Sequence, residues 1–190
     1  MLIRSITSLA CTALLATASL AQMTPMNHEG AKAGDKPAKP LASPAATAEV
    51  SLDGKDLKIT YNRPSMRGRK IMGGLVPYGE VWRTGANPAT TLTTAADLKI
   101  GTLTVPAGTY TLFTLPSKEQ WLFIVSKKTG EWGIPYPEGN DLGRTPMTSA
   151  AALPESQEMM SISFENTKGN TTELHVKWDK TDEFVKVTAE

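Results

Sequence analysis

The sequence predicts an all-β protein whose folded part is a single antiparallel β-sandwich. Three observations support this fold class. Apolar and polar residues alternate with a period of two in most segments after residue 48. Turn-forming residues separate these segments at a spacing of roughly 8–12 residues. No window of a dozen residues shows the 3.6-residue period of an amphipathic helix. The pattern leaves open whether the sandwich is a jelly roll.

The expected strands begin with a hairpin. Alternating residues on both sides of Asp53-Gly54 predict two strands joined by a two-residue turn, because Asp-Gly favours the tight turns of β-hairpins. The segment 121–125 is continuously apolar, which is typical of a strand buried on both faces. Further strands are predicted at 90–94, 98–105 with a turn at Gly101, 109–115, 160–164, 174–178 and 184–187. The expected core includes Trp121, Phe123, Ile162, Phe164, Leu174, Val176 and Trp178.

The N-terminus has the features of a secretory signal peptide. Arg4 supplies a positive charge, residues 6–18 are apolar or small, and Ser19-Leu20-Ala21 resembles a cleavage site. A buried N-terminal helix is a weaker interpretation, and a lipoprotein signal ending before Cys11 would leave almost no apolar region. We therefore expect residues 1–21 to be removed and the protein to be exported, to the periplasm or outside the cell. The mature chain would contain no cysteine.

Residues 22–48 are predicted to be a disordered tether. They are rich in Ala, Pro and Lys and contain no aromatic residue, so they cannot bury enough apolar area to offset their chain entropy. Met23, Met26 and His28 could hold a soft metal ion, but incidental linker composition explains them more simply. We therefore predict no metal site, and a folded domain at 49–190.

Composition excludes several classes of function. The net charge of +1 argues against a nucleic-acid binder that neutralises many phosphates. One cysteine excludes a disulfide framework and a cysteine-rich zinc site. Nucleotide-binding, G-x-S-x-G and H-E-x-x-H motifs are absent from the sequence, and no cofactor is expected. His175 lies at a polar position of an alternating strand, so we expect it to face solvent rather than serve a catalytic triad.

The segment 61–87 is the most informative for function. It is long, irregular and rich in Gly and Pro, and it holds four of the five arginines that follow residue 21. Arginine forms planar bidentate contacts with carboxylate and phosphate groups, which predicts a pocket for an anionic, glycan or peptide ligand. The candidate ligand-binding residues here are Arg63, Arg67, Arg69, Tyr78, Trp82, Arg83 and Asn87.

A structural role for these arginines is equally open. Residues 50–130 hold eleven basic side chains against five acidic ones, a balance of +6. Residues 131–190 hold five basic side chains against eleven acidic ones, a balance of −6. The arginines could therefore pair with carbonyl groups or with acids of the C-terminal half.

A second loop, 129–144, adds Trp132 and Tyr136 as candidate ligand-binding residues. Aromatic rings flanked by Gly and Pro could form a platform for a sugar, or they could cap the end of the core, which is the simpler interpretation. Glu138, Asn140 and Asp141 offer oxygen ligands, but their spacing does not match a calcium-binding loop.

Two functions follow, and the sequence favours the first without deciding whether the protein is an enzyme. The first is a non-catalytic binding module that recognises its ligand through the loop 61–87. The second is a hydrolase of an envelope polymer that uses a carboxylate pair such as Glu80 and Glu131. We expect no nucleic-acid partner and no membrane span in the mature chain.

Several motifs resemble a bacterial family of secreted proteins known as domain of unknown function 2911. They are GGLVPYGEVWRTGAN at 73–87, RPS at 63–65, GRKI at 68–71, VPAGTYTLFTL at 105–115 and WGIPY at 132–136. The resemblance runs from about residue 43 to the end. It implies an export signal, a polar tether and one mostly-β domain, and it brings no activity, cofactor or catalytic residue. In the family pattern an acidic residue usually follows Gly-Ala-Asn, whereas this chain has Pro88 there, so it would lack that acid if it belonged to a site.

Overall fold

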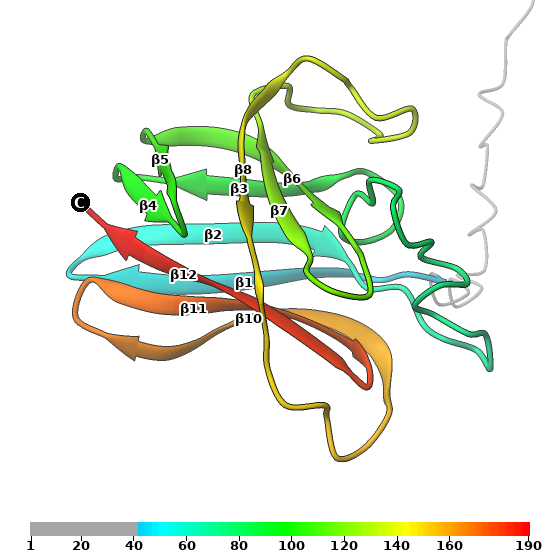
Figure 1. The fold of residues 1–190 in the computed structure, drawn as a ribbon. Helices are drawn as coiled ribbons and strands as arrows, with labels where there is room; N and C mark the ends of the chain where they lie inside the picture. The colour runs from blue at the N-terminus through cyan, green and yellow to red at the C-terminus, as the bar shows by residue number, and fades with distance from the viewer. Residues whose placement is uncertain (1–41) are drawn as a thin grey trace, which may run out of the picture. The chain divides into compact units, whose positions relative to one another are not determined.

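The computed structural model describes residues 42–190, so the predicted signal peptide and most of the predicted tether lie outside the described residues. These described residues fold into two antiparallel β-sheets (Figure 1) and contain no helix. Sheet 1 has the strand order β1(Ala45–Leu52), β2(Lys55–Asn62), β3(Thr90–Thr94), β6(Gly108–Leu115), β7(Leu122–Ser126) and β8(Asp141–Pro146). Sheet 2 has the order β10(Gln157–Lys168), β11(Thr171–Asp179), β12(Thr181–Ala189), β4(Leu98–Ile100) and β5(Leu103–Val105), and β9(Thr148–Ser149) pairs with β12.

The predicted all-β sandwich is confirmed, and its topology is close to two meanders. Consecutive strands lie side by side in each sheet, except where β4 and β5 leave sheet 1 to join sheet 2. This is not the pair of Greek keys that makes a jelly roll. The sheet edges also approach each other, since β1 lies beside β10 and β5 lies beside β8.

The first hairpin shows how sequence determines register. Leu52 pairs with Lys55, so Asp53 and Gly54 alone form the turn, and both have positive φ angles, 49° and 78°. That geometry matches the two-residue turns that suit twisted antiparallel strands. The register places Leu52, Leu57 and Ile59 on the inner face, where each is buried.

The core lies between the sheets. Six of the seven expected core residues are buried, and Phe164 is partly buried against the same cluster. Trp178 and Phe123 are among the largest fully buried side chains.

Some elements differ from the prediction. The strand β8 was not expected, because its sequence DLGRTP has no period-two apolar pattern; it is an edge strand paired only with β7. The first strand begins at Ala45, inside the predicted tether, because the backbone from Ala45 onwards pairs with β2. Pairing with a neighbouring strand therefore orders small residues that composition alone assigned to a tether.

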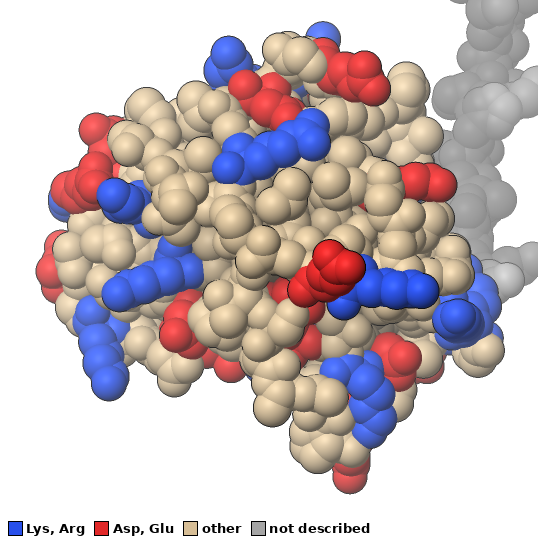
Figure 2. All heavy atoms as spheres, in the orientation of Figure 1, with Lys and Arg blue, Asp and Glu red and all other residues tan. Residues whose placement is uncertain are grey.

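The surface carries both signs of charge. Figure 2 shows basic and acidic side chains interspersed over one face of the molecule. Within residues 42–190 there is also no helix of the length and apolarity needed to cross a membrane.

Candidate functional site: a groove lined by arginine and tryptophan

The loop between β2 and β3, residues 63–89, is fixed to both sheets. Ser65 forms an isolated bridge with Met159 of sheet 2, and Trp82 forms one with Thr114 of sheet 1. The bridge at Trp82 consists of two backbone hydrogen bonds to Thr114, 2.8 and 2.9 Å long. The loop, at the right in Figure 1, thus lies across one end of the sandwich with a defined backbone.

A groove with a volume of about 300 Å³ lies where this loop meets the core. Its deepest lining residue is Trp178, which is 1% exposed and stacks on Trp82 with ring centroids 5.9 Å apart. Leu75 and Ile134 line the same groove and are 44% and 66% exposed, so they form its rim. Both indole N–H groups donate within the protein, Trp82 to the Gly85 carbonyl and Trp178 to the Glu158 carbonyl. The walls therefore offer mainly apolar surface.

Two arginines complete the groove. Arg69 is exposed and donates through Nε and Nη2 to the carbonyls of Met66 and Ser65, at 2.9 and 2.7 Å. Arg83 is half-buried and donates through Nη1 to the Trp132 carbonyl at 3.0 Å. Its guanidinium also lies 5.2 Å from the centroid of the Trp132 ring, a cation–π distance.

Neither arginine forms an ion pair with a carboxylate among residues 42–190. A guanidinium has five N–H donors, so each retains donors that these hydrogen bonds do not use. Partial burial lowers the pKa of Arg83 from its ordinary value, because its charge is incompletely solvated. The groove therefore combines two cations with an apolar lining and no carboxylate.

Three predicted residues of the loop 61–87 serve as anchors outside the groove. Arg63 donates from Nε to the Met160 carbonyl at 3.0 Å. Arg67 donates from Nη2 to the Ala42 carbonyl at 3.2 Å. Asn87 donates to the Ser43 carbonyl at 3.3 Å. Arg63 thus holds the loop to β10, while Arg67 and Asn87 hold it to the residues before β1.

The predicted aromatic residues are divided among three places. Trp82 lines the groove, and Trp132 lies under Arg83 at its border. Tyr78 is 38% exposed and packs its ring against Gly73, where a Cβ atom would lie 2.8 Å from Tyr78 Cε2.

Tyr136 lines a different hollow, packs edge-on against Phe113, and is hydrogen-bonded to Asp141 and Arg144. Burial and the hydrogen bond to Asp141 raise the pKa of Tyr136 to about 12.

Leu75, Ile134 and Trp178 also line the groove, although they are not among the site residues predicted from the sequence. Trp178 was expected in the core, where it is, but one part of it also lines the groove. Leu75 and Ile134 are apolar residues within the two loops that were already singled out. Apolar residues in loops rich in Gly and Pro are a sequence signal that could have identified Leu75 and Ile134 as site residues.

The acids of the C-terminal half do not pair with the loop arginines. Three of them, Glu165, Glu173 and Asp182, surround His175. His175 is 5% exposed, so the expectation that it faces solvent was wrong. Its Nδ1 lies 2.7 Å from Asp182 Oδ1, and its ring stacks on Phe184 at 4.9 Å. The outer face of β11 is covered here by side chains of β12, which a period-two pattern cannot reveal.

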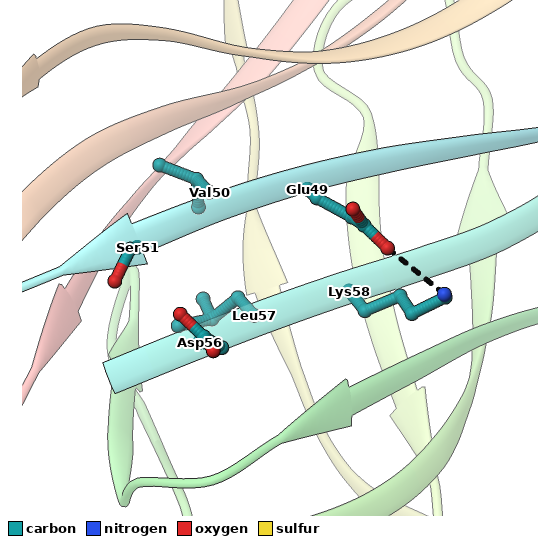
Figure 3. A pocket seen from close by; sticks show the side chains of 6 residues that line it. All are labelled: Glu49, Val50, Ser51, Asp56, Leu57 and Lys58. Carbon is teal, nitrogen blue, oxygen red and sulfur yellow. Dashed lines mark ion pairs between the residues drawn. The ribbon is translucent and has the colours of Figure 1, made fainter. Parts of the chain in front are cut away.

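A second hollow lies on the outer face of β1 and β2 (Figure 3). Glu49 and Lys58 form an ion pair across it at 2.8 Å, and both side chains are more than half exposed. Such an exposed pair contributes little to stability or specificity. The hollow brings together none of the predicted site residues.

Comparison with protein-family models places most of the chain in a family. The family model "Protein of unknown function (DUF2911)" matches residues 43–187. The chain belongs to this family. A comparison with curated proteins and one with solved structures each gave no match. The family match covers both loops of the groove and all twelve strands apart from the last residues of β12.

Proposed function

We propose that this DUF2911 protein is an exported, non-catalytic binding module whose groove takes a small anion with an apolar body. The observation that carries the proposal is the pair Arg69 and Arg83, which line an apolar groove without a carboxylate partner among residues 42–190. Export rests on the sequence features of residues 1–21.

The chemistry of the groove supports this ligand class. Free guanidinium donors bind carboxylate or phosphate groups through charge-assisted hydrogen bonds. An apolar body would cover the apolar surface of Trp82 and Leu75, and each Å² removed from water contributes about 25 cal/mol. The volume is at the lower end for small-molecule sites, about 300–1,000 Å³. An acidic glycan or a peptide would present the same carboxylate group to the two arginines.

Catalysis lacks comparable support. The described lining contains no histidine and no carboxylate. Glu80 is exposed and does not line the groove, and Glu131 pairs with Lys128 at 3.7 Å. No specific observation favours the alternative of a hydrolase that uses these two acids.

Two fluorescent probes of similar shape test the proposal. Anilinonaphthalene sulfonate is an apolar anion, and N-phenyl-1-naphthylamine is its uncharged counterpart. We expect Arg69→Ala/Arg83→Ala to weaken binding of the sulfonate by about 10- to 100-fold, the loss of charge-assisted hydrogen bonds worth about 1.5–3 kcal/mol. Binding of the uncharged probe should change by less than about threefold, because it makes no such bonds.

The matched control is Arg67→Ala, since Arg67 is an exposed arginine of the same loop that does not line the groove. It should leave sulfonate binding within about twofold of the wild type. Urea unfolding should show that Arg69→Ala changes the free energy of unfolding by no more than about 0.5 kcal/mol, as for surface sites. Equal losses for both probes, or equal losses in the control, would contradict the proposal.

A further inference from the structure

Exposed large apolar side chains gather at one end of the molecule. Among residues 42–190 they are Leu75, Tyr78, Trp132 and Ile134, with exposed fractions of 44%, 38%, 55% and 66%. All four belong to the loop 63–89 or to the loop between β7 and β8. These loops contact each other, since Ala89 donates a backbone hydrogen bond to the Glu131 carbonyl and Arg83 donates to the Trp132 carbonyl.

We call these four residues the apolar tip. Leu75 and Ile134 line one groove, and Trp132 lies next to it under Arg83, so at least three of the four are neighbours. Scattered exposed apolar residues need no explanation, but a contiguous exposed patch marks a binding surface.

The two loops that carry the tip have an excess of basic side chains. Residues 63–89 contain five basic side chains and one acidic side chain, and residues 127–140 contain two of each. Arg67, Arg69 and Lys70 are exposed, and none of them forms an ion pair among the described residues. The positive charge next to the tip is therefore available to an external anionic surface.

We propose that the apolar tip docks on an anionic lipid surface. Trp132, Ile134 and Leu75 enter the boundary between headgroups and acyl chains, and the adjacent cations contact the headgroups. Tryptophan suits this boundary because its ring is apolar and its N–H is polar. Apolar side chains and basic residues together give reversible binding that depends on anionic lipid. This docking does not require the groove to hold a soluble ligand, so it goes beyond the proposed function.

Charge complementarity favours an anionic lipid surface as the occupant. The loop 63–89 borders the tip with five basic side chains against one acidic side chain, and anionic headgroups attract such basic segments. A bilayer offers both an apolar layer and a dense anionic layer, which match the apolar side chains of the tip and the basic side chains beside it.

Vesicle sedimentation with the purified full chain tests the proposal. Vesicles of phosphatidylcholine with 30% phosphatidylglycerol, about a third anionic lipid, are compared with pure phosphatidylcholine vesicles. We expect at least about tenfold tighter binding to the anionic vesicles and a loss of that preference in high salt. Trp132→Ser/Ile134→Ser should weaken binding about tenfold or more, since two apolar side chains no longer enter the bilayer.

Charge variants complete the design. Lys70→Gln should weaken binding to anionic vesicles about fivefold, as expected for one basic residue near an anionic surface. The control Lys58→Gln, on the outer face of β1 and β2, should leave it unchanged. All proteins compared here carry the same N-terminal residues. Any vesicle binding by those residues therefore contributes equally to the wild type and to each variant.

Three results would overturn the proposal: equal binding to both kinds of vesicle, binding unaffected by the serine substitutions, or a dimer in solution that the serine substitutions dissociate. The last would identify a second copy as the occupant of the tip. The soluble probes keep this outcome separate from the proposed function. A protein that binds the sulfonate but no vesicle loses only the docking proposal, and the reverse result removes only the groove proposal.

Discussion

Two regions of this protein concentrate charge, and they use it in opposite ways. On the outer face of sheet 2, Glu165, Glu173, His175, Lys177 and Asp182 contact one another. At the groove, the hydrogen bonds of the Arg69 and Arg83 guanidinium groups all go to backbone carbonyls. A carbonyl satisfies hydrogen-bond geometry but does not neutralise a full positive charge. In the first region, which we call the closed region, charged side chains pair with one another. In the second, the open region, the two arginines remain available to an external anion.

The closed region shows what neutralisation does to its members. Burial alone would raise the pKa of Glu165, but hydrogen bonds from Lys177 and Ser163 outweigh it and lower the pKa. The hydrogen bond from Asn166, followed by that from His175, lowers the pKa of Glu173. Burial opposes the charge of Lys177, yet Glu165 and Asp182 raise its pKa. The charged forms of Glu165, Glu173 and Lys177 are thus stabilised by neighbours in the same sheet.

The largest expected effect tests this closure. Asp182 is 8% exposed, and its Oδ2 lies 3.5 Å from Lys177 Nζ. We expect Asp182→Ala to lower the free energy of unfolding by about 3 kcal/mol, because it leaves His175 and Lys177 without a buried partner. Urea unfolding measures the change. Asp182→Asn keeps an acceptor for His175 and should lose less. A loss below about 0.5 kcal/mol in the alanine variant would mean that the cluster is no more than surface charge.

The next effect is smaller and depends on pH. Glu183 follows Asp182 in β12 and is 5% exposed. Ser149 donates a hydrogen bond to its Oε1, whereas its Oε2 has no hydrogen-bond partner among the described residues. Burial raises its pKa, with Asp182 adding to the rise and the Ser149 bond opposing it. A raised carboxyl pKa means that the folded state binds the proton more tightly, so ionised Glu183 lowers stability at neutral pH.

Glu183→Gln should therefore raise stability at pH 7, and the gain should vanish as pH falls below about 4, where the unfolded carboxyl is protonated too. Glu165→Gln should do the opposite. The lowered pKa of Glu165 contributes stability above the unfolded pKa, and this stability is lost as pH falls through the folded pKa. Urea unfolding across pH 3–8, about the range of carboxyl and histidine titration, measures both. Two curves that shift in the same direction would refute the contrast.

Local sequence patterns predicted most of the strands but not β8 and β9. Half-buried strands must alternate, and β1, β2, β10 and β11 do, so their segments were identified from the sequence. The edge strand β8 has one fully buried residue, Thr145, and therefore leaves no apolar alternation. The two-residue strand β9 exists only because β12 pairs with it. Pairing partners set by tertiary structure are not encoded in a local period.

The sequence predicted which loops form the candidate site, but it did not predict which of their residues line the groove. Arginine density singled out the segment 61–87, and Arg69, Trp82 and Arg83 of that segment do line one groove. Which arginines become anchors depends on which carbonyls the fold brings near them, as with Arg63 and Met160, which are far apart in sequence. Trp178 belongs to sheet 2, and it lines the groove because Trp82 of the loop stacks on its ring. Such contacts follow from the packing of distant segments.

The smallest expected effect concerns Glu80, the acid on which a hydrolase would depend. Glu80 is exposed, and no hydrogen bond or ion pair holds its side chain among the described residues. A catalytic carboxylate needs a positioned partner and a fixed geometry, and Glu80 has neither. We expect Glu80→Gln to change the free energy of unfolding by no more than about 0.5 kcal/mol and to leave sulfonate binding within about twofold. Because Glu80 is the acid of the loop that carries the two groove arginines, removing its charge could only strengthen anion binding slightly. Glycan and ester substrates incubated with both proteins provide the decisive measurement: turnover by the wild type that is lost in Glu80→Gln would make the open region an active site rather than a binding groove.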